Sequence, residues 1–346
     1  MFDAIIVGAG IAGLHTAWRL QQQGSSVLVL EARDRVGGRL LSHAVSDAAQ
    51  VDLGATWIWP AERRVTALVR ELGLQTFTQY DTGQILYDVR GGDVQAVPGA
   101  PGSAPSLRIQ GGPASLAKAI HDRLAPGTVR LETKVMGVEE RGADGLAVLI
   151  DGEPEQTAEH VVIALPPALA MHSIAFDPPL PEELERIASS TPVWMGSIVK
   201  TVVVYASPFW RAAGFSGTAL SNAGPLQEVH DHCGAEGEPA ALFGFTSVDP
   251  PAIEAPPREA VLLQLVRLFG PDAGHPLEFL QRDWSGSEFT SPPGVGRLQN
   301  HELFGHPVFA KATLGGRLHF SSAETSGAQA HIEDALAASA RTVERL

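Results

Sequence analysis

Cysteine and long apolar runs are what this 346-residue chain has least of. Cys233 is its only cysteine, so it can form neither an internal disulfide nor a metal site built on several cysteines. The 12 histidines show no ligand-like spacing, so we expect no metal. No stretch is long and apolar enough to span a bilayer, and the N-terminus begins like a strand rather than a signal peptide. We therefore expect a soluble, cytoplasmic protein.

Positive charge is also scarce. Against 39 Asp and Glu the chain has 25 Lys and Arg, a net charge of -14. This excess argues against nucleic acid as a partner. It could attract a cationic substrate, although solubility alone would explain it. With 44% hydrophobic residues the chain can bury a sizeable core, and its length predicts two cooperating domains.

The first thirty residues have the pattern of a dinucleotide-binding unit. Residues 3–7 are nearly all apolar, as in a strand buried on both faces of a parallel sheet. A glycine-rich turn, a helical stretch at 14–23 and a second buried strand at 27–30 follow. In the turn, Gly8 permits the tight bend, Gly10 lets the backbone approach a pyrophosphate, and Gly13 lets the helix pack against the strand.

An acidic residue, Glu31, ends the second strand. There it would accept hydrogen bonds from the ribose hydroxyls of an adenosine and disfavour a 2′-phosphate, which makes NADP an unsuitable ligand. The helix N-terminus offers free N–H groups and a partial positive charge to the phosphates. This motif alone does not distinguish FAD from NAD.

Periodicity along the remaining chain predicts alternating helices and strands. We expect helices at 62–72, 115–124, 259–269 and 332–346, and strands at 129–140, 145–150, 161–164, 198–205, 240–246 and 318–320. Residues 91–106, rich in Gly, Pro and Ala, are expected to form a loop.

The segment after the second strand indicates a family. It reads Glu31-Ala32-Arg33-Asp34-Arg35-Val36-Gly37-Gly38-Arg39 and resembles the E-A-x-x-R-x-G-G-R signature of the flavin amine oxidases and their relatives, which include phytoene desaturases. The resemblance implies that Gly37 and Gly38 let the backbone pass the FAD diphosphate and that Arg39 neutralises it. A turn with a surface arginine is the alternative, but the strand-helix-strand unit directly upstream disfavours it.

Later segments resemble the same family in chain order. Asp52-Leu53-Gly54-Ala55-Thr56-Trp57 is similar to the segment that lies against the flavin, Gly111-Gly112 to a helix start, Lys134-Val135 to the adenine-reading site, and Ala164-Leu165-Pro166-Pro167 to a strand end. The residues that the resemblance implies for FAD binding are Gly8, Gly10, Ile11, Ala12, Gly13, Glu31, Ala32, Arg33, Gly38, Arg39, Gly54, Ala55, Thr56, Trp57, Val135, Glu324 and Ile332.

Two of these lie near the C-terminus. Glu324 would meet the ribityl or phosphate region, and the Ile332 amide, at a helix start, would point at flavin N1–C2=O. Glu288 stands where monoamine oxidases attach their flavin through a cysteine, and Cys233 lies elsewhere, so the resemblance implies non-covalent FAD.

A lysine inside an apolar strand is the candidate for catalysis. The run around Lys200 resembles the lysine-bearing strand of monoamine oxidases, which implies that Lys200 reaches a water hydrogen-bonded to flavin N5. A lysine in such a run is costly unless it is paired or hydrated. Alternation also permits a lysine on the solvent face of an edge strand, but the following Phe209-Trp210 favours the catalytic role.

The family's substrate cage consists of two aromatic rings in front of the flavin. By position these come from Phe289 and His331, with Trp284 walling the site. Two rings would attract an amine by cation–π contact and align it with N5. His331 could instead cap a helix or lie on the surface. The long helical insertion that roofs monoamine oxidases is missing, because only 77–112 fill that interval, so the pocket is open or roofed by another subunit, and an oligomer is possible.

The resemblance implies a two-domain α/β fold. A Rossmann-like FAD-binding domain would comprise 1–76, 111–170 and 297–346, and a substrate domain with a mixed or antiparallel sheet would comprise 77–110 and 171–296. The implied reaction is oxidation of an amine C–N bond by hydride transfer to flavin N5, with dioxygen or another acceptor taking the electrons. The alternatives are a desaturase or oxidase of an apolar substrate and a catalytically degenerate FAD-binding module.

Overall fold

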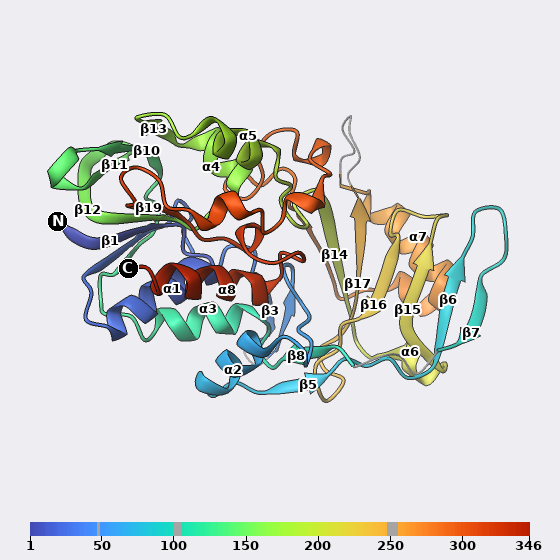
Figure 1. The fold of residues 1–346 in the computed structure, drawn as a ribbon. Helices are drawn as coiled ribbons and strands as arrows, with labels where there is room; N and C mark the ends of the chain where they lie inside the picture. The colour runs from blue at the N-terminus through green and yellow to red at the C-terminus, as the bar shows by residue number, and fades with distance from the viewer. Residues whose placement is uncertain (47–48, 100–104, 248–254) are drawn as a thin grey trace.

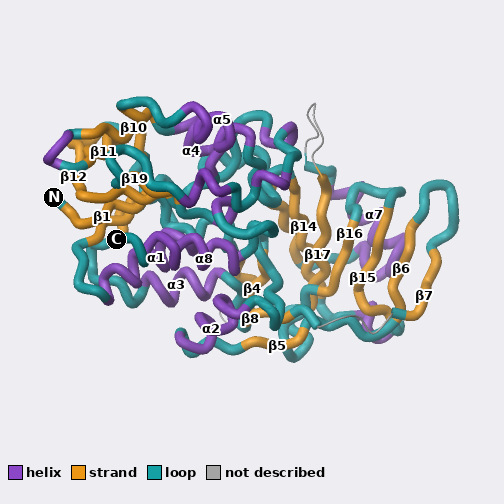
Figure 2. Tube along the Cα trace, in the orientation of Figure 1, coloured by secondary structure: helices purple, strands orange, loops and turns teal. Residues whose placement is uncertain are grey.

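The computed structural model describes residues 1–46, 49–99, 105–247 and 255–346, which form two lobes, each built on one large sheet (Figures 1 and 2). Within these residues the first sheet has the order β13-β10-β11-β12-β1-β2-β9, and β19 pairs with β12. Its strands are β1 (Phe2–Val7), β2 (Val27–Leu30), β9 (Val129–Arg130), β10 (Val135–Glu140), β11 (Leu146–Ile150), β12 (Glu153–Ile163), β13 (Ala175–Asp177) and β19 (Leu318–Phe320).

The centre of the first sheet is parallel and buried on both faces. β1 pairs in parallel with β2 and β12, and β12 with β19. Successive residues of a strand point to opposite faces, so Ile6 packs under one layer of helices and Ile5 under the other. The helices are α1 (Ile11–Gln22), α3 (Ala114–His121) and α8 (Ile332–Val343) on one side, with α2 (Arg63–Glu71) beside them, and α4 (Pro167–Ser173) and α5 (Glu182–Ser190) on the other (Figure 1).

The second sheet has the order β18-β14-β17-β16-β15-β6-β7 within the described residues. Its strands are β6 (Gln84–Asp88), β7 (Gln95–Pro98), β14 (Ile198–Tyr205), β15 (Phe215–Ser221), β16 (Glu228–Asp231), β17 (Ala240–Ser247) and β18 (Glu278–Asp283). Helix α7 (Arg258–Phe269) packs Val261 against Val203 on one face. On the other face Val202 packs against Val51, so this face is directed towards the first lobe.

Short elements complete the structure. Two small sheets pair β3 (Ser42–Ser46) with β4 (Ala49–Asp52) and β5 (Thr76–Thr78) with β8 (Leu107–Ile109). Short helices are α6 (Phe209–Ala212) and the 3-10 turns η1 (Gly142–Asp144), η2 (Pro271–Gly274), η3 (Val295–Arg297), η4 (His301–Leu303), η5 (Pro307–Ala310) and η6 (Ala323–Thr325). No helix in the described ranges is long and apolar enough to cross a membrane.

The predicted fold class and most predicted elements are confirmed, and two predictions are wrong. The strand expected at 129–140 is split into β9 and β10, because Glu132 adopts φ 53° and its N–H donates to the Arg33 carbonyl (2.8 Å). The Thr133 N–H donates to the Glu31 carbonyl (2.8 Å). The chain therefore pairs with the end of the dinucleotide motif instead of continuing straight.

The loop expected at 91–106 contains a strand. β7 pairs with β6 to form a hairpin at the edge of the second sheet (Figure 1), and β8 begins at Leu107. Residues 100–104 of that prediction lie outside the described residues. A hairpin thus fills part of the interval that carries helices in the resembling family.

Some residues expected in the substrate domain belong spatially to the first lobe. β13 pairs in parallel with β10, and Leu184 of α5 lies in the same core as Ile5. After α5, the chain enters the second sheet at β14.

Candidate active site

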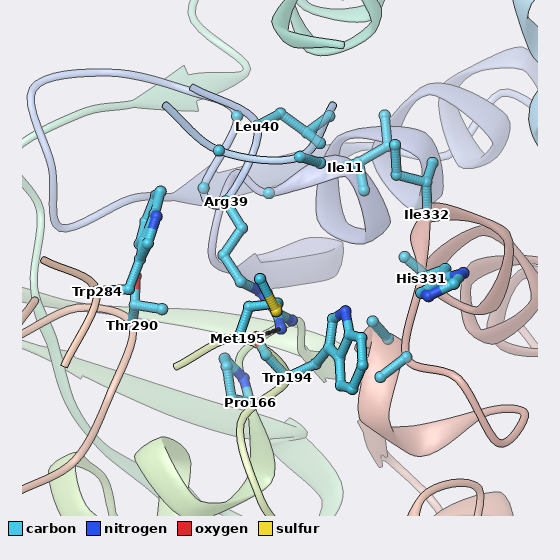
Figure 3. A pocket seen from close by; sticks show the side chains of 18 of the residues that line it. Ile11, Arg39, Leu40, Pro166, Trp194, Met195, Trp284, Thr290, His331 and Ile332 are labelled. Atoms are coloured by element: carbon cyan, nitrogen blue, oxygen red, sulfur yellow. Dashed lines mark hydrogen bonds between the residues drawn. The ribbon is translucent and has the colours of Figure 1, made fainter. Parts of the chain in front are cut away.

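A cavity of about 470 Å³ is lined by residues of both lobes. Its walls come from the start of α1, the segment 31–40, the loop 54–57, strand β14, the segment 284–290 and the start of α8. Figure 3 shows Arg39, Trp194 and Met195 near its centre, with Trp284 and Thr290 on one side and His331 and Ile332 on the other. The predicted residues that line it are Gly8, Gly10, Ile11, Ala12, Glu31, Arg33, Gly38, Arg39, Gly54, Ala55, Thr56, Trp57, Lys200, Trp284, Phe289, His331 and Ile332.

The three motif glycines have different surroundings. Gly8 adopts φ 104°, which few residues with a side chain reach. A Cβ on Gly13 would lie 2.0 Å from the Gly8 carbonyl oxygen, so Gly13 permits the close contact of helix and strand without lining the cavity. A Cβ on Gly10 would meet nothing within 4 Å and would project into the cavity. The space left there fits a diphosphate against the α1 N-terminus.

The carboxylate of Glu31 is buried and fixed in place. It accepts the Ala9 N–H (2.8 Å) on one oxygen and the Arg33 N–H (3.0 Å) on the other. Each oxygen has a further lone pair, so the carboxylate can still accept a bond from a ribose hydroxyl. The Arg33 guanidinium donates to the Thr290 hydroxyl (2.6 Å), and its burial lowers the pKa of Arg33 to about 10.

A second cavity of about 560 Å³ adjoins the first. Both are lined by Gly8, Glu31, Leu165 and Phe289, so the two cavities meet beside the glycine turn. The predicted residues Ala32 and Val135 line the second cavity rather than the first. An elongated ligand with a diphosphate in the middle and a ring system at each end fits this arrangement.

Arg39 and Glu324 form a buried ion pair at the wall of the first cavity. Their side chains meet at 2.6 Å and 3.1 Å, and Glu324 is fully buried. The Trp194 carbonyl accepts a further bond from Arg39 (3.0 Å). Glu324, which we expected to meet the cofactor, lines neither cavity and contacts Arg39, which lines the first.

Lys200 lies on an interior strand. β14 is flanked by β17 and β18, so the alternative of a lysine on an exposed edge is wrong. The side chain is 2% exposed, and its ammonium donates to the Gly54 carbonyl (2.9 Å) and the Thr56 hydroxyl (2.5 Å). It lies 4.3 Å from the centre of the Phe243 ring. Burial lowers the pKa of Lys200 to about 7.

His331 lies both at the start of α8 and in the cavity wall. Its ring stacks on Trp59 at 5.0 Å with an angle of 19°, and the Trp194 ring lies 5.7 Å away. Its Nδ1 is 3.0 Å from the Glu62 carboxylate. Sequence reasoning missed Trp59, Glu62 and Trp194. The signal for Trp59 was its spacing of two from Trp57, since residues two apart in an extended segment share a face.

Phe289 and His331 both line the first cavity, and Phe289 also lines the second. The Phe289 ring lies 5.7 Å from both Arg33 and Lys134 and lines the two cavities near Glu31. The pairing of the two rings as a substrate cage stays a prediction; Phe289 lies where the two cavities meet, on the side of Glu31 and Arg33. Trp284 does line the first cavity, where its Nε1–H donates to the Leu53 carbonyl (3.1 Å).

One family model matches the chain from residue 11 to residue 346. Residues 11–101 and 102–346 match the model described as flavin containing amine oxidoreductase. The chain belongs to this family. FAD is its cofactor and amine oxidation is its reaction. Cys233, the only cysteine, is buried under the second sheet and lines neither cavity, which agrees with non-covalent FAD.

Named relatives of this amine oxidase agree with the assignment. The chain is 28% identical to putrescine oxidase of Kocuria rosea, over 83% of each chain. It is 25% identical to amine oxidase [flavin-containing] B of Mus musculus, over 94% of this chain and 82% of that protein. A structure of wild-type putrescine oxidase bound to putrescine superposes with a TM-score of 0.84 at 25% identity, covering 99% and 98% of the two chains. The desaturase and degenerate-module alternatives find no support in these comparisons.

The described ranges contain no candidate metal site. No group of three or more His, Cys, Asp and Glu side chains there could hold an ion.

Proposed function

We propose that the amine binds in the first cavity, between the loop 54–57 and the start of α8, where its α C–H can face flavin N5. FAD, when bound, would accept the hydride, which carries the two electrons of the C–N oxidation. The observation that carries this proposal is the buried Lys200, whose ammonium contacts the loop expected against the flavin and lines the cavity.

Each proposed residue has a separate task. Lys200 holds a water next to the reacting atoms, and its pKa of about 7 lets it donate or accept a proton near neutral pH. His331, Trp59 and Trp194 form the ring-lined end that orients the amine. The Ile332 N–H, at the N-terminus of α8, stabilises negative charge on the nearest part of the cofactor.

Finer features are also proposed. Dioxygen is the acceptor we propose, and the cytoplasm the location. The FAD-binding domain consists of three chain segments around the first sheet, and the substrate domain is the second sheet with α7. We also propose that a second subunit covers the cavity as a roof.

Anaerobic mixing of the yellow holoenzyme with candidate substrates tests the proposal. We expect a monoamine or a diamine such as putrescine to bleach the flavin absorbance, and apolar compounds without nitrogen to leave it unchanged. The variant Lys200→Met should retain FAD and lose at least about tenfold in the rate of reduction or reoxidation, whereas Lys311→Met, at an exposed site, should match the wild type. Failure of every amine to reduce a correctly loaded flavin would contradict the proposal.

A further inference from the structure

Behind the loop 54–57 lies a buried group of charged side chains that the cavity does not include. Asp52, Arg108 and His232 are 1%, 4% and 1% exposed and line neither cavity. They come from β4, from β8 and from the residue after β16. Three distant parts of the chain thus place ionisable groups directly behind the loop that Lys200 contacts.

Asp52 and Arg108 form an ionic pair in this interior. The Arg108 guanidinium lies 3.6 Å from one Asp52 oxygen, and the Ser42 hydroxyl donates to the other (2.9 Å). A guanidinium stays protonated in proteins, and a buried one needs an opposite charge. Gly112 packs closely against the carboxylate, since an added Cβ there would lie 2.2 Å from Asp52 Oδ1. Little water can screen the pair.

His232 is neutral and adds no charge of its own. Its Nε2 accepts the Asp52 backbone N–H (2.8 Å), so that nitrogen carries no proton. Burial, with the nearby Arg108 and Lys200 cations, holds the pKa of His232 well below its usual value. The imidazole therefore fixes the end of β4, two residues before the Gly54 carbonyl that Lys200 contacts.

We propose that Asp52 and Arg108 are positioning residues that set the charge of the Lys200 ammonium from behind the cofactor loop, with opposite signs. This inference rests on the proposed role of Lys200. Besides burial, which lowers the pKa of Lys200, Asp52 raises that pKa and Arg108 lowers it. In a dry interior these opposing charges act on Lys200 far more strongly than they would in water.

Other charged groups face the same strand. Arg282 lies opposite Lys200 on β18, but its guanidinium is held by the Ser287 hydroxyl (3.0 Å) and the Trp284 ring. Glu228, on β16, is paired with His230 at 3.2 Å. Asp52 and Arg108 are the charged groups that act on the Lys200 ammonium, and both are buried, so a substitution of either one unbalances the charge there.

The chain makes the charge of Lys200 directly measurable. It has only four lysines, Lys118, Lys134, Lys200 and Lys311. Holoenzyme carrying 13C-labelled lysine will give four side-chain signals, and their chemical shifts against pH yield the titration midpoint of each. The spectrum of Lys200→Met identifies the signal of interest.

Four variants test the direction in which each charge moves the Lys200 midpoint. We expect Arg108→Gln to raise the Lys200 midpoint and Asp52→Asn to lower it, each by about one to three pH units. The double variant D52N/R108Q should return towards the wild type, and Arg108→Lys, which keeps the charge, should remain near it. The pH profile of anaerobic flavin reduction should move in the same directions. If D52N does not fold, the difference between R108Q and the double variant still isolates the contribution of Asp52.

Purely structural roles would lower stability without moving the midpoint in opposite directions. Two outcomes would overturn the inference. One is a shift of the Lys200 midpoint in the same direction in both single variants. The other is a Lys200 midpoint that equals the wild-type value in R108Q as well as in the double variant. If amines fail to reduce the flavin while the midpoints still move oppositely, the proposed function is wrong and the inference about Lys200 stands.

Discussion

The Glu62 carboxylate holds the His331 ring at the end of the cavity, with 3.0 Å between Oε1 and Nδ1. The other carboxylate oxygen accepts the backbone N–H of Trp59 (3.0 Å), and the Trp59 ring stacks on His331. One buried acid thus holds the imidazole and the backbone that carries the stacked indole. His331 is therefore an imidazole backed by an indole and held by a carboxylate.

Removing the imidazole tests whether this stack orients the substrate. We expect His331→Ala to lower kcat/KM for amines by about tenfold, since a ring at such a site contributes roughly one to two kcal/mol to cation binding. His331→Phe keeps a ring and should recover part of the loss. Steady-state kinetics at saturating FAD provide the measurement, and equal activity of the alanine variant and the wild type would exclude this role.

Phe289 should behave in the opposite way. Because its ring lies with Arg33 and Lys134, on the side of Glu31 where we expect the adenosine, Phe289→Ala should weaken FAD binding by about tenfold. Its kcat/KM for amines should stay near the wild-type value once FAD is saturating. Flavin fluorescence on titrating apoprotein gives the affinity. A large loss of kcat/KM with unchanged FAD affinity would instead return Phe289 to the substrate cage.

The glycine turn offers a matched pair of substitutions. Gly10→Ala adds a methyl group where nothing lies within 4 Å, so the apoprotein should keep its stability while FAD binding falls by at least about tenfold. Gly13→Ala forces a Cβ to within 2.0 Å of the Gly8 carbonyl oxygen, which should cost about 2–3 kcal/mol of folding free energy or prevent folding. Urea unfolding of both apoproteins separates the two effects, and equal stabilities would contradict the assignment.

The dinucleotide motif was predictable because its signals are local. The turn from Gly8 to Gly13, the helix after it and Glu31 at the next strand end lie within one short segment, and each choice of residue has a direct backbone reason. Strand β14 was equally clear from its β-branched residues. Lys200 could be singled out in it because a charge in such a run is costly.

Contacts between distant segments could not be predicted from sequence. Glu62 meets His331 across 269 positions, and the Asp52 N–H meets His232 across 180. Glu62 and His232 stand in no motif. The packing of α2 beside α8 brings Glu62 to His331, and the contact between the two lobes brings Asp52 to His232. For Phe289, position in the chain does not determine which part of a long cavity its loop reaches.

The fold also predicts how acid destabilises the protein through His15. This side chain, 8% exposed, joins α1 to α8: its Nε2 accepts from Arg19 (3.1 Å), which leaves Nδ1–H to donate to the Ser339 hydroxyl (2.8 Å). Burial, with the Arg19 charge, lowers the pKa of His15 to about 4. The unfolded chain takes up a proton as pH falls through about 6.5, whereas the folded state does so only near 4. The stability that neutral His15 contributes is therefore fully present above about pH 6.5, and it is lost progressively as the pH falls from 6.5 to 4.

Between pH 7 and pH 5 this linkage should cost about 2 kcal/mol of unfolding free energy. The variant His15→Gln cannot take up that proton, so its stability should fall less over the same interval, although it starts lower at pH 7. Urea denaturation of both proteins at the two pH values measures the difference. His319, whose pKa burial also lowers to about 4, remains in both proteins and serves as an internal constant. If the unfolding free energy falls equally in the wild type and the variant, His15 takes up its proton at the same pH in the folded and unfolded states. The hydrogen bonds that join α1 to α8 would then open before the protein unfolds in acid.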